Sequence, residues 1–284
     1  MRNSIFFSCA FALMAIAGCN KSGLAGEDQL MRFSPQLPGT KASETAFESG
    51  DEIGVYVTEY KGDIPSMLQL SGNFGNNSRL SLNGSEWTLS PQIWWGEGKY
   101  DVYAYYPFDS EINSVDEYCF EVLSDQRGEG FTRSDFMWAR KQAVSRMESV
   151  PLNFRHKLSR LDIVLTKGED YEGDIPSDAE VRIYSTNTSA LVDLESGDVV
   201  KNPYGKVGNI IAHQNSTGSY SAIIVPQKLL NAVPLVEILA KDASYLVTSK
   251  FIFSEGTRHT MTIELSSNPD KVVINVGGGI EGWN

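Results

Sequence analysis

Short runs of β-branched and aromatic residues, separated by turn sequences, follow one another along most of the chain. In some runs apolar and polar residues alternate with a period of two, as in Leu161-Asp162-Ile163-Val164-Leu165, which is typical of a strand with one buried face. No long stretch has the 3.6-residue period of an amphipathic helix; within 131–150, Ser134 could cap a short helix, but Phe136-Met137-Trp138 fits a strand equally well. The other predicted strands are 53–57, 100–106, 118–123, 150–154, 181–184, 220–225, 233–240, 245–253, 260–265 and 272–276.

Many short strands joined by turns predict an all-β protein made of β-sandwiches. Gly, Asp, Glu and Pro cluster at 167–176 (KGEDYEGDIP), and such a cluster is typical of a link between domains. We therefore expect an N-terminal sandwich over residues 47–168 and a C-terminal sandwich over residues 169–284.

The N-terminus has the pattern of an export signal. A basic Arg2 precedes a short apolar run, 5–17, which is too short to span a bilayer as a mature helix. Ile16-Ala17-Gly18-Cys19 resembles a bacterial lipobox, so we expect residues 1–18 to be a lipoprotein signal peptide and Cys19 to carry the lipid. The alternative is an ordinary signal peptide with a chance cysteine. The lipid would anchor the protein at the outer membrane, on the cell surface, and residues 19–46 would contain a polar tether followed by a first strand.

Composition narrows the possible functions. The 284-residue chain has a formal net charge of −12, and its densest basic run is Arg155-His156-Lys157 with Arg160. This balance argues against nucleic-acid binding, which needs a basic face. With Cys9 in the leader and Cys19 lipidated, Cys119 has no partner for an intrachain disulfide. Its alternating neighbours predict that it is buried.

Candidate chemistry is sparse. His156, His213 and His259 are far apart and have no second ligand at metal-binding spacing. No nucleophile elbow, phosphate loop or zinc-protease motif occurs, so we expect no enzyme activity, no metal and no cofactor. An aromatic group could form a stacking platform for a sugar, but the run Tyr100–Tyr106 is apolar on both faces, which favours a central sandwich strand. The group consists of Trp87, Trp94, Trp95, Tyr100, Tyr103, Tyr105 and Tyr106.

Several segments, in order, resemble the fimbrillin family of Bacteroidetes, the FimA- and Mfa-type pilins. The resemblance covers nearly the whole mature chain, with a small departure at His259, where the family usually has an aromatic residue. The segments are Phe47–Tyr56 (FESGDEIGVY), Tyr100–Phe108 (YDVYAYYPF), Leu152–Leu158 (LNFRHKL), Ala222–Gln227 (AIIVPQ), Gly256–Leu265 and the ending Ile280–Trp283.

This resemblance implies two tandem transthyretin-like β-sandwiches and a structural role for His156. It also implies removal of the first strand, 30–34, by a trypsin-like protease and completion of the open groove by a strand from a neighbouring pilus subunit. The family's usual Arg cleavage site is replaced here by Lys41, and Arg32 lies within the expected first strand. Three outcomes stay open: cleavage after Lys41, cleavage after Arg32, or no cleavage at either residue.

The C-terminal segment is the candidate donor strand, with Val272, Ile274, Val276, Ile280 and Trp283 as its key residues. The alternative is that this strand completes its own domain. The first functional hypothesis is a structural subunit of an adhesive pilus that polymerises with other pilin subunits by strand exchange. The second is a glycan-binding outer-membrane lipoprotein of a polysaccharide-uptake system.

Overall fold

The computed structural model describes residues 29–38, 46–270, 273–275 and 281–283. Strands dominate these ranges, and the one helix within them is α1 (Glu129–Arg133). The prediction of an all-β protein is therefore confirmed. The ambiguous stretch 131–150 contains the end of α1, which is capped at its C-terminus by Ser134, and then strand β8 (Met137–Val144).

Seven strands of the N-terminal half, including β8, form one sheet. The others are β2 (Glu52–Lys61), β3 (Ile64–Pro65), β4 (Gly75–Asn83), β5 (Glu86–Ser90), β6 (Tyr100–Tyr106) and β10 (Arg155–His156). The strand order is β10-β8-β6-β2-β4-β5, with β3 paired to β2. Every residue of β6 is buried, so the prediction that β6 is a central strand is confirmed.

Successive side chains of strand β6 point to opposite faces of this sheet, and each face packs against its own apolar cluster. Val102 and Ala104 of β6 face one apolar cluster, whereas Tyr103 and Tyr105 face another. The first cluster is covered by the parallel pair β1 (Phe33–Gln36) and β9 (Val150–Asn153). The second is covered by a three-stranded sheet of β7 (Tyr118–Glu121), β13 (Ser189–Val192) and β14 (Val199–Lys201). The sheet is therefore buried on both faces.

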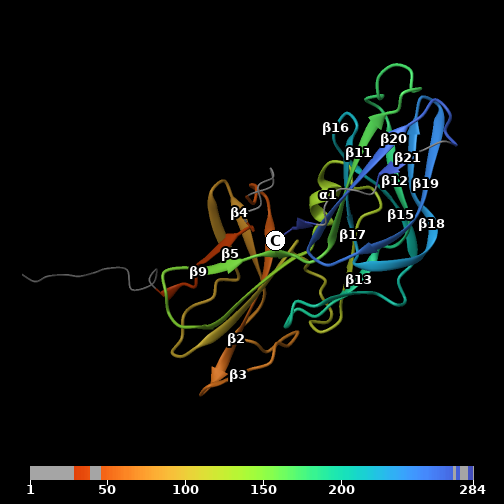
Figure 1. Cartoon of the computed structure of the whole chain (residues 1–284). Helices are drawn as coiled ribbons and strands as arrows, with labels where there is room; N and C mark the ends of the chain where they lie inside the picture. Colours follow the sequence, from red (N-terminus) through yellow and green to blue (C-terminus); the bar gives the residue numbers. More distant parts are fainter. Residues whose placement is uncertain (1–28, 39–45, 271–272, 276–280, 284) are drawn as a thin grey trace, which may run out of the picture.

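The C-terminal half has two further sheets, shown in green to blue in Figure 1. One contains β11 (Ser159–Lys167), β16 (His213–Ser216), β17 (Ser219–Ile224), β20 (Thr257–Leu265), β21 (Val273–Asn275) and β22 (Glu281–Gly282). The other contains β12 (Glu180–Asn187), β15 (Val207–Ile211), β18 (Gln227–Ala240) and β19 (Ala243–Phe253). Ile163 and Ile263 of the first sheet and Ile183 and Ile238 of the second belong to one core cluster and are fully buried.

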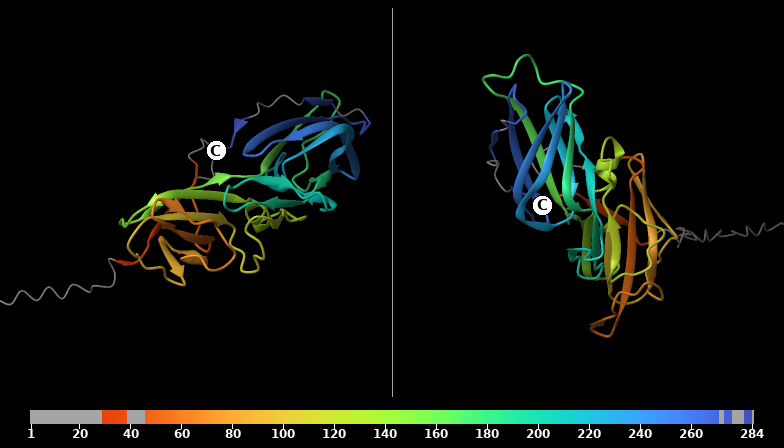
Figure 2. Two further views of the ribbon diagram at one scale, coloured as in Figure 1. Left: turned by 90° about the horizontal axis from the view of Figure 1, so that it is seen from below. Right: turned by 90° about the vertical axis from the view of Figure 1, so that its right-hand side faces the viewer.

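Strand pairing crosses the boundary expected at residue 168. Strand β11, which the prediction placed in the N-terminal sandwich, pairs with β17 and, in parallel, with β20. Strand β7 likewise pairs with β13. The period-two pattern of 161–165 predicts a strand but carries no information about its partners. Figure 2 shows the consequence: the green strands run from the red-to-yellow group into the teal-to-blue group.

The prediction that Cys119 is buried is also wrong. In β7, Tyr118 and Phe120 point into the core and Cys119 is exposed on the opposite face. Its sulfur lies 3.2 Å from Ser189 Oγ. The alternation of a strand places neighbouring residues on opposite faces, so burial of the two aromatic residues brings Cys119 to the surface.

Candidate assembly interface

The first strand fills one edge of the N-terminal core. Its odd-numbered residues point inward: Met31 and Phe33 are buried, and Leu37 packs against the same cluster. The backbone is paired along its length, with Met31 N donating to Ile93 O (2.8 Å) and Val150 N donating to Arg32 O (2.8 Å). Its removal would expose apolar side chains and unpaired backbone groups of β9.

The bounds of this strand differ from the predicted 30–34. Leu30 forms an isolated bridge with Trp94, and the regular strand runs over Phe33–Gln36. The sequence prediction treated Pro35 as part of the following link. The structure places it inside the strand, opposite Leu152. Proline is tolerated there because β1 is an edge strand and needs no further backbone donor.

A groove of about 610 Å³ runs beside the first strand. Leu30–Phe33 form one wall and residues 85–89, which include most of β5, form another. Strand β5 lies at the edge of the seven-stranded sheet. The start of the first strand, Leu30–Phe33, therefore borders open space between itself and β5.

The predicted cleavage and lipidation residues fall in different places. Arg32 is exposed, directly before β1. Lys41 and Cys19 lie outside the described residues.

The predicted donor segment is only partly described. Val272, Val276 and Ile280 lie outside the described ranges, whereas Ile274 belongs to β21, which pairs antiparallel with β20. Farther on, β22 pairs with Thr257 and Arg258. In this single chain, the described part of the C-terminal segment thus lies against its own sheet.

Trp283 has the most extensive contacts of the described tail. Its side chain is 4% exposed, and its indole stacks on the His156 ring with centroids 3.9 Å apart and planes 5° apart. The Arg160 guanidinium lies 5.8 Å from the indole centroid. Trp283 N donates to Gly256 O (2.8 Å). The tail therefore ends in a site made by residues of β10 and β11 and the turn before β20.

Three members of the basic run that contains these residues have carboxylate partners. His156 Nδ1 lies 2.8 Å from Asp135 Oδ2, and Lys157 forms an ion pair with Glu255. Arg160 Nε donates to Asp162 Oδ1 (2.8 Å). Three of the four basic residues in the run therefore contact carboxylates, whereas Arg155 is exposed.

The Asp162 carboxylate is the centre of a buried polar network. It accepts hydrogen bonds from Arg160, from Ser221 Oγ (2.6 Å) and from Arg258. Burial raises the pKa of the Asp162 carboxyl, but the arginine charges and the Ser221 hydroxyl outweigh burial, so the net pKa lies below its ordinary value. Asp162 is therefore held as a carboxylate, which fixes Arg160.

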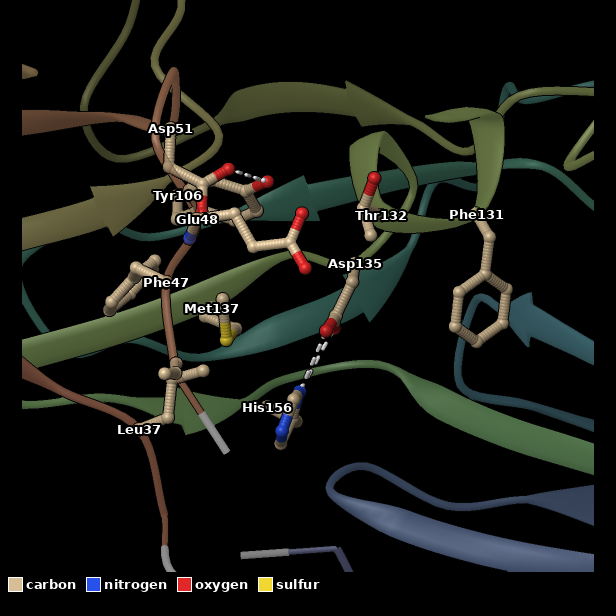
Figure 3. Close-up of a pocket in the computed structure, with 11 residues that line it drawn as sticks. Leu37, Phe47, Glu48, Asp51, Tyr106, Phe131, Thr132, Asp135, Met137 and His156 are labelled. Carbon is tan, nitrogen blue, oxygen red and sulfur yellow. Dashed lines mark hydrogen bonds and ion pairs between the residues drawn. The ribbon is translucent and has the colours of Figure 1, made fainter. Parts of the chain in front are cut away.

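A cavity of about 300 Å³ adjoins the His156–Asp135 pair (Figure 3). Its lining includes Leu37 and Phe47, and it also contains Asp51, whose Oδ1 accepts a hydrogen bond from Tyr106 Oη (3.0 Å). Burial raises the pKa of Tyr106, and the nearby Asp51 charge raises it further. Among the described residues that line this cavity there is no serine or cysteine, so none of them places either of these nucleophiles beside the His–Asp pair.

The aromatic group divides into buried and exposed members. Trp95 and the β6 tyrosines are buried, which confirms their predicted packing role, but Trp94 is 46% exposed. Within the ranges that the structure describes, no group of three His, Cys, Asp or Glu side chains is arranged to hold a metal. Among the same residues, no helix has the length and apolar character needed to cross a bilayer.

Sequence reasoning singled out His156 and Arg160 but missed Asp135, Asp162 and the contact with Trp283. Asp135 and Asp162 lie among many acidic residues, and no local spacing marks them. Their partners become evident only when the strands are assembled.

Comparison with known proteins gives a family match over most of the chain. The model of the Fimbrillin-like family matches residues 40–283. A search of curated protein sequences finds no match.

Solved structures have the same fold. A candidate cell adhesion protein from Bacteroides ovatus has a TM-score of 0.73 at 17% identity, over 90% of this chain and 98% of that one. A second, from Bacteroides uniformis, has a TM-score of 0.68 at 20% identity, over 91% and 99%. The tip fimbrial protein Mfa3 from Porphyromonas gingivalis has a TM-score of 0.50 at 8% identity, over 83% and 95%.

Proposed function

Since the chain belongs to the fimbrillin-like family, we propose that it is a structural subunit of an adhesive cell-surface pilus and joins its neighbours by strand exchange. The observation that carries this proposal is the first strand, an N-terminal edge strand whose inward side chains complete an apolar core. Loss of such a strand leaves a groove that another extended segment can fill by β-augmentation. We expect no catalysis and no cofactor.

The register of the first strand supports cleavage after Lys41. A cut after Arg32 would leave Phe33–Gln36 paired with β9, because β1 begins at Phe33. Phe33 would still fill the core. A cut after Lys41 lies beyond the C-terminal end of β1, so the whole strand can leave. A trypsin-like protease that opens the groove must therefore cut on the C-terminal side of β1.

The C-terminal segment is the proposed donor. In its sequence Val272, Ile274 and Val276 alternate with other residues, and the inward residues Met31 and Phe33 of the first strand have the same period of two. A strand with this alternation can place apolar side chains into the vacated positions. In the single chain, the described residues of β21 form three cross-strand pairs with β20, so release of the segment has to open this pairing.

We place the protein at the outer membrane through a lipid on Cys19. The lipobox-like sequence before that residue supports this placement. Changing Cys19→Ala should abolish incorporation of labelled fatty acid, and labelling of the variant would show that the anchor assignment is wrong.

The polymerisation test uses a Lys- and Arg-specific protease followed by size analysis. Trimmed full-length protein should convert from monomer to a ladder of polymers, and protein lacking residues 271–284 should be trimmed but stay monomeric. Polymers that form equally well without 271–284 would falsify the donor assignment. No polymer under any condition would instead favour the glycan-binding function, in which case the monomer should be retained on a polysaccharide gel.

A further inference from the structure

The site that holds Trp283 is preformed by buried residues. We call His156, Arg160 and the backbone of Gly256 the Trp283 socket. His156 is 5% exposed and is fixed by Asp135, and Arg160 is 9% exposed and is fixed by Asp162. Both socket side chains are thus oriented by bonds that do not involve the tail.

The rest of the described tail is paired through its backbone. Strand β21 contributes three residue pairs with β20, and β22 contributes two. A Cβ added at Gly282 would meet no atom within 4 Å, so the residue before Trp283 has open space at that position. Among the tail residues whose side chains are described, Trp283 is the buried one, and it is held by ring stacking and a cation–π contact.

The position of the socket links it to assembly. The proposed donor segment, 271–276, is followed within the same tail by β22 and Trp283, and the C-terminus lies between the two halves of the molecule (Figure 1). A donor strand cannot enter a neighbour while the residues that follow it stay fastened to their own chain.

We propose that the Trp283 socket is a latch that holds the C-terminal tail on its own subunit, and that undocking of Trp283 limits the rate of strand exchange. This inference rests on the proposed function, since it concerns how exchange is regulated. The occupant of the socket is the indole of the chain's own tail, and the latch opens when that indole leaves the His156 ring.

The first experiment compares Trp283→Ala with wild type and with Tyr204→Ala. Tyr204 is 93% exposed, so this control removes an aromatic ring that packs against nothing. Amide hydrogen exchange of the C-terminal peptide should be about tenfold faster in Trp283→Ala, because stacking and cation–π contacts are lost. Trp283→Phe keeps a ring for stacking on His156 and should be intermediate.

The same proteins are then trimmed, and polymer growth is followed over time. Trp283→Ala should polymerise faster than wild type, by about the factor seen in hydrogen exchange, and Tyr204→Ala should match wild type. Unchanged exchange of the tail would overturn the latch. Faster exchange with unchanged or slower polymerisation would overturn its control of the rate.

A reversible lock separates tail release from general destabilisation. Thr257 and Gly282 are cross-strand partners. The next pair along the ladder, Gly256 and Trp283, is a hydrogen-bonded pair, because Trp283 N donates to Gly256 O. Thr257 and Gly282 therefore form a non-hydrogen-bonded pair, with Cα atoms about 4.5 Å apart, which suits a disulfide. A Thr257→Cys, Gly282→Cys protein is made with Cys19 and Cys119 changed to serine.

Oxidation of this protein should stop polymerisation after trimming, and reductant should restore it. Polymer growth in the oxidised, fully cross-linked protein would show that exchange does not require release of the tail. If wild type, Trp283→Ala and reduced protein all stay monomeric, strand exchange itself is refuted, and the rate-limiting latch with it. If wild type, Trp283→Ala and the reduced protein polymerise at equal rates, strand exchange stands and only the rate-limiting latch is refuted.

Discussion

The first strand and the C-terminal tail both close an edge of the molecule, but their side chains are held in different surroundings. Met31 and Phe33 are surrounded by apolar side chains of the N-terminal core. Trp283 is held between a histidine and an arginine, each fixed by a carboxylate. The first strand has several inward residues, and in the tail Trp283 is the inward residue whose side chain is described.

This difference teaches how a subunit can be stable before assembly and still exchange strands. A strand buried through several apolar positions leaves slowly, so its removal calls for a covalent cut. In the described ranges the tail pairs through two short strands and seats one ring, and we propose that this attachment can open and close again. The proposed order of events, cleavage at the N-terminal side and reversible release at the C-terminal side, follows from these two modes of attachment.

The largest expected effect comes from the first strand. Phe33→Ala removes a buried ring and should lower the free energy of unfolding by about 3–5 kcal/mol. Leu246→Ala is the control, because Leu246 is 51% exposed and its truncation should change stability by about 0.5 kcal/mol or less. Urea unfolding measures both. A Phe33→Ala protein as stable as wild type would mean that the strand contributes little to the core.

The support beneath the tail should have the next largest effect. Asp162→Asn leaves Arg160 and Arg258 without their buried carboxylate and should lower stability at pH 7 by about 2–3 kcal/mol. In Asp174→Asn, by contrast, the lost ion pair with Lys167 is exposed, and no measurable change is expected.

The pH dependence of the Asp162 effect has a definite sign. The folded pKa is depressed, so the contribution is present above the unfolded pKa of about 3.9 and is lost as pH falls through the lower folded value. The difference between wild type and Asp162→Asn should therefore shrink below about pH 4. A difference that is constant from pH 7 to pH 3 would show that the Asp162 charge does not stabilise this network.

Elements set by local pattern were predicted well. The run Tyr100–Tyr106 is apolar on both faces, and β6 is indeed buried on both. The expected structural role of His156, which came from the family resemblance, agrees with its bond to Asp135 and its stacking on Trp283. The strand pattern predicts that β6 is buried on both faces, and the family motif predicts that His156 has a structural role.

Pairing between distant segments could not be predicted. The pattern of β11 is the same whichever sheet it joins, so the sequence does not reveal that β11 pairs with β17 and β20, which lie beyond residue 168. The stacking of Trp283 on His156 joins the C-terminal tail to the middle of the chain, and one sequence carries no signal for it. Trp94 was predicted to pack with Trp95, but strand-like alternation at this point leaves one indole at the surface.

A smaller effect is expected at Trp94, whose backbone bridges to Leu30 at the start of the first strand. Because the indole is 46% exposed, Trp94→Ala should cost below about 1 kcal/mol. Buried Trp95 is the matched comparison, and its truncation should cost about 3–5 kcal/mol. A Trp94→Ala protein that keeps its stability but loses retention on a polysaccharide gel would favour the glycan-binding function.

The smallest effect on stability is expected for the two candidate cleavage residues, which nevertheless decide how the first strand leaves. Arg32 is exposed and takes part in pairing through its backbone oxygen, so Arg32→Gln should change the free energy of unfolding by about 0.5 kcal/mol or less.

A protease must draw its substrate into an extended, unpaired form, and Val150 N and Phe154 N hold the backbone of Arg32 and Gln36. Trimming should therefore give a product that begins at Ala42, equally in wild type and Arg32→Gln. Lys41→Gln should abolish that product and leave the subunit monomeric. The intact mass of the trimmed protein reads out the new N-terminus. A wild-type product that begins at Phe33 and still polymerises would contradict the requirement that the whole of β1 leaves, since Phe33 would then have to give up its place in the core without being cut away.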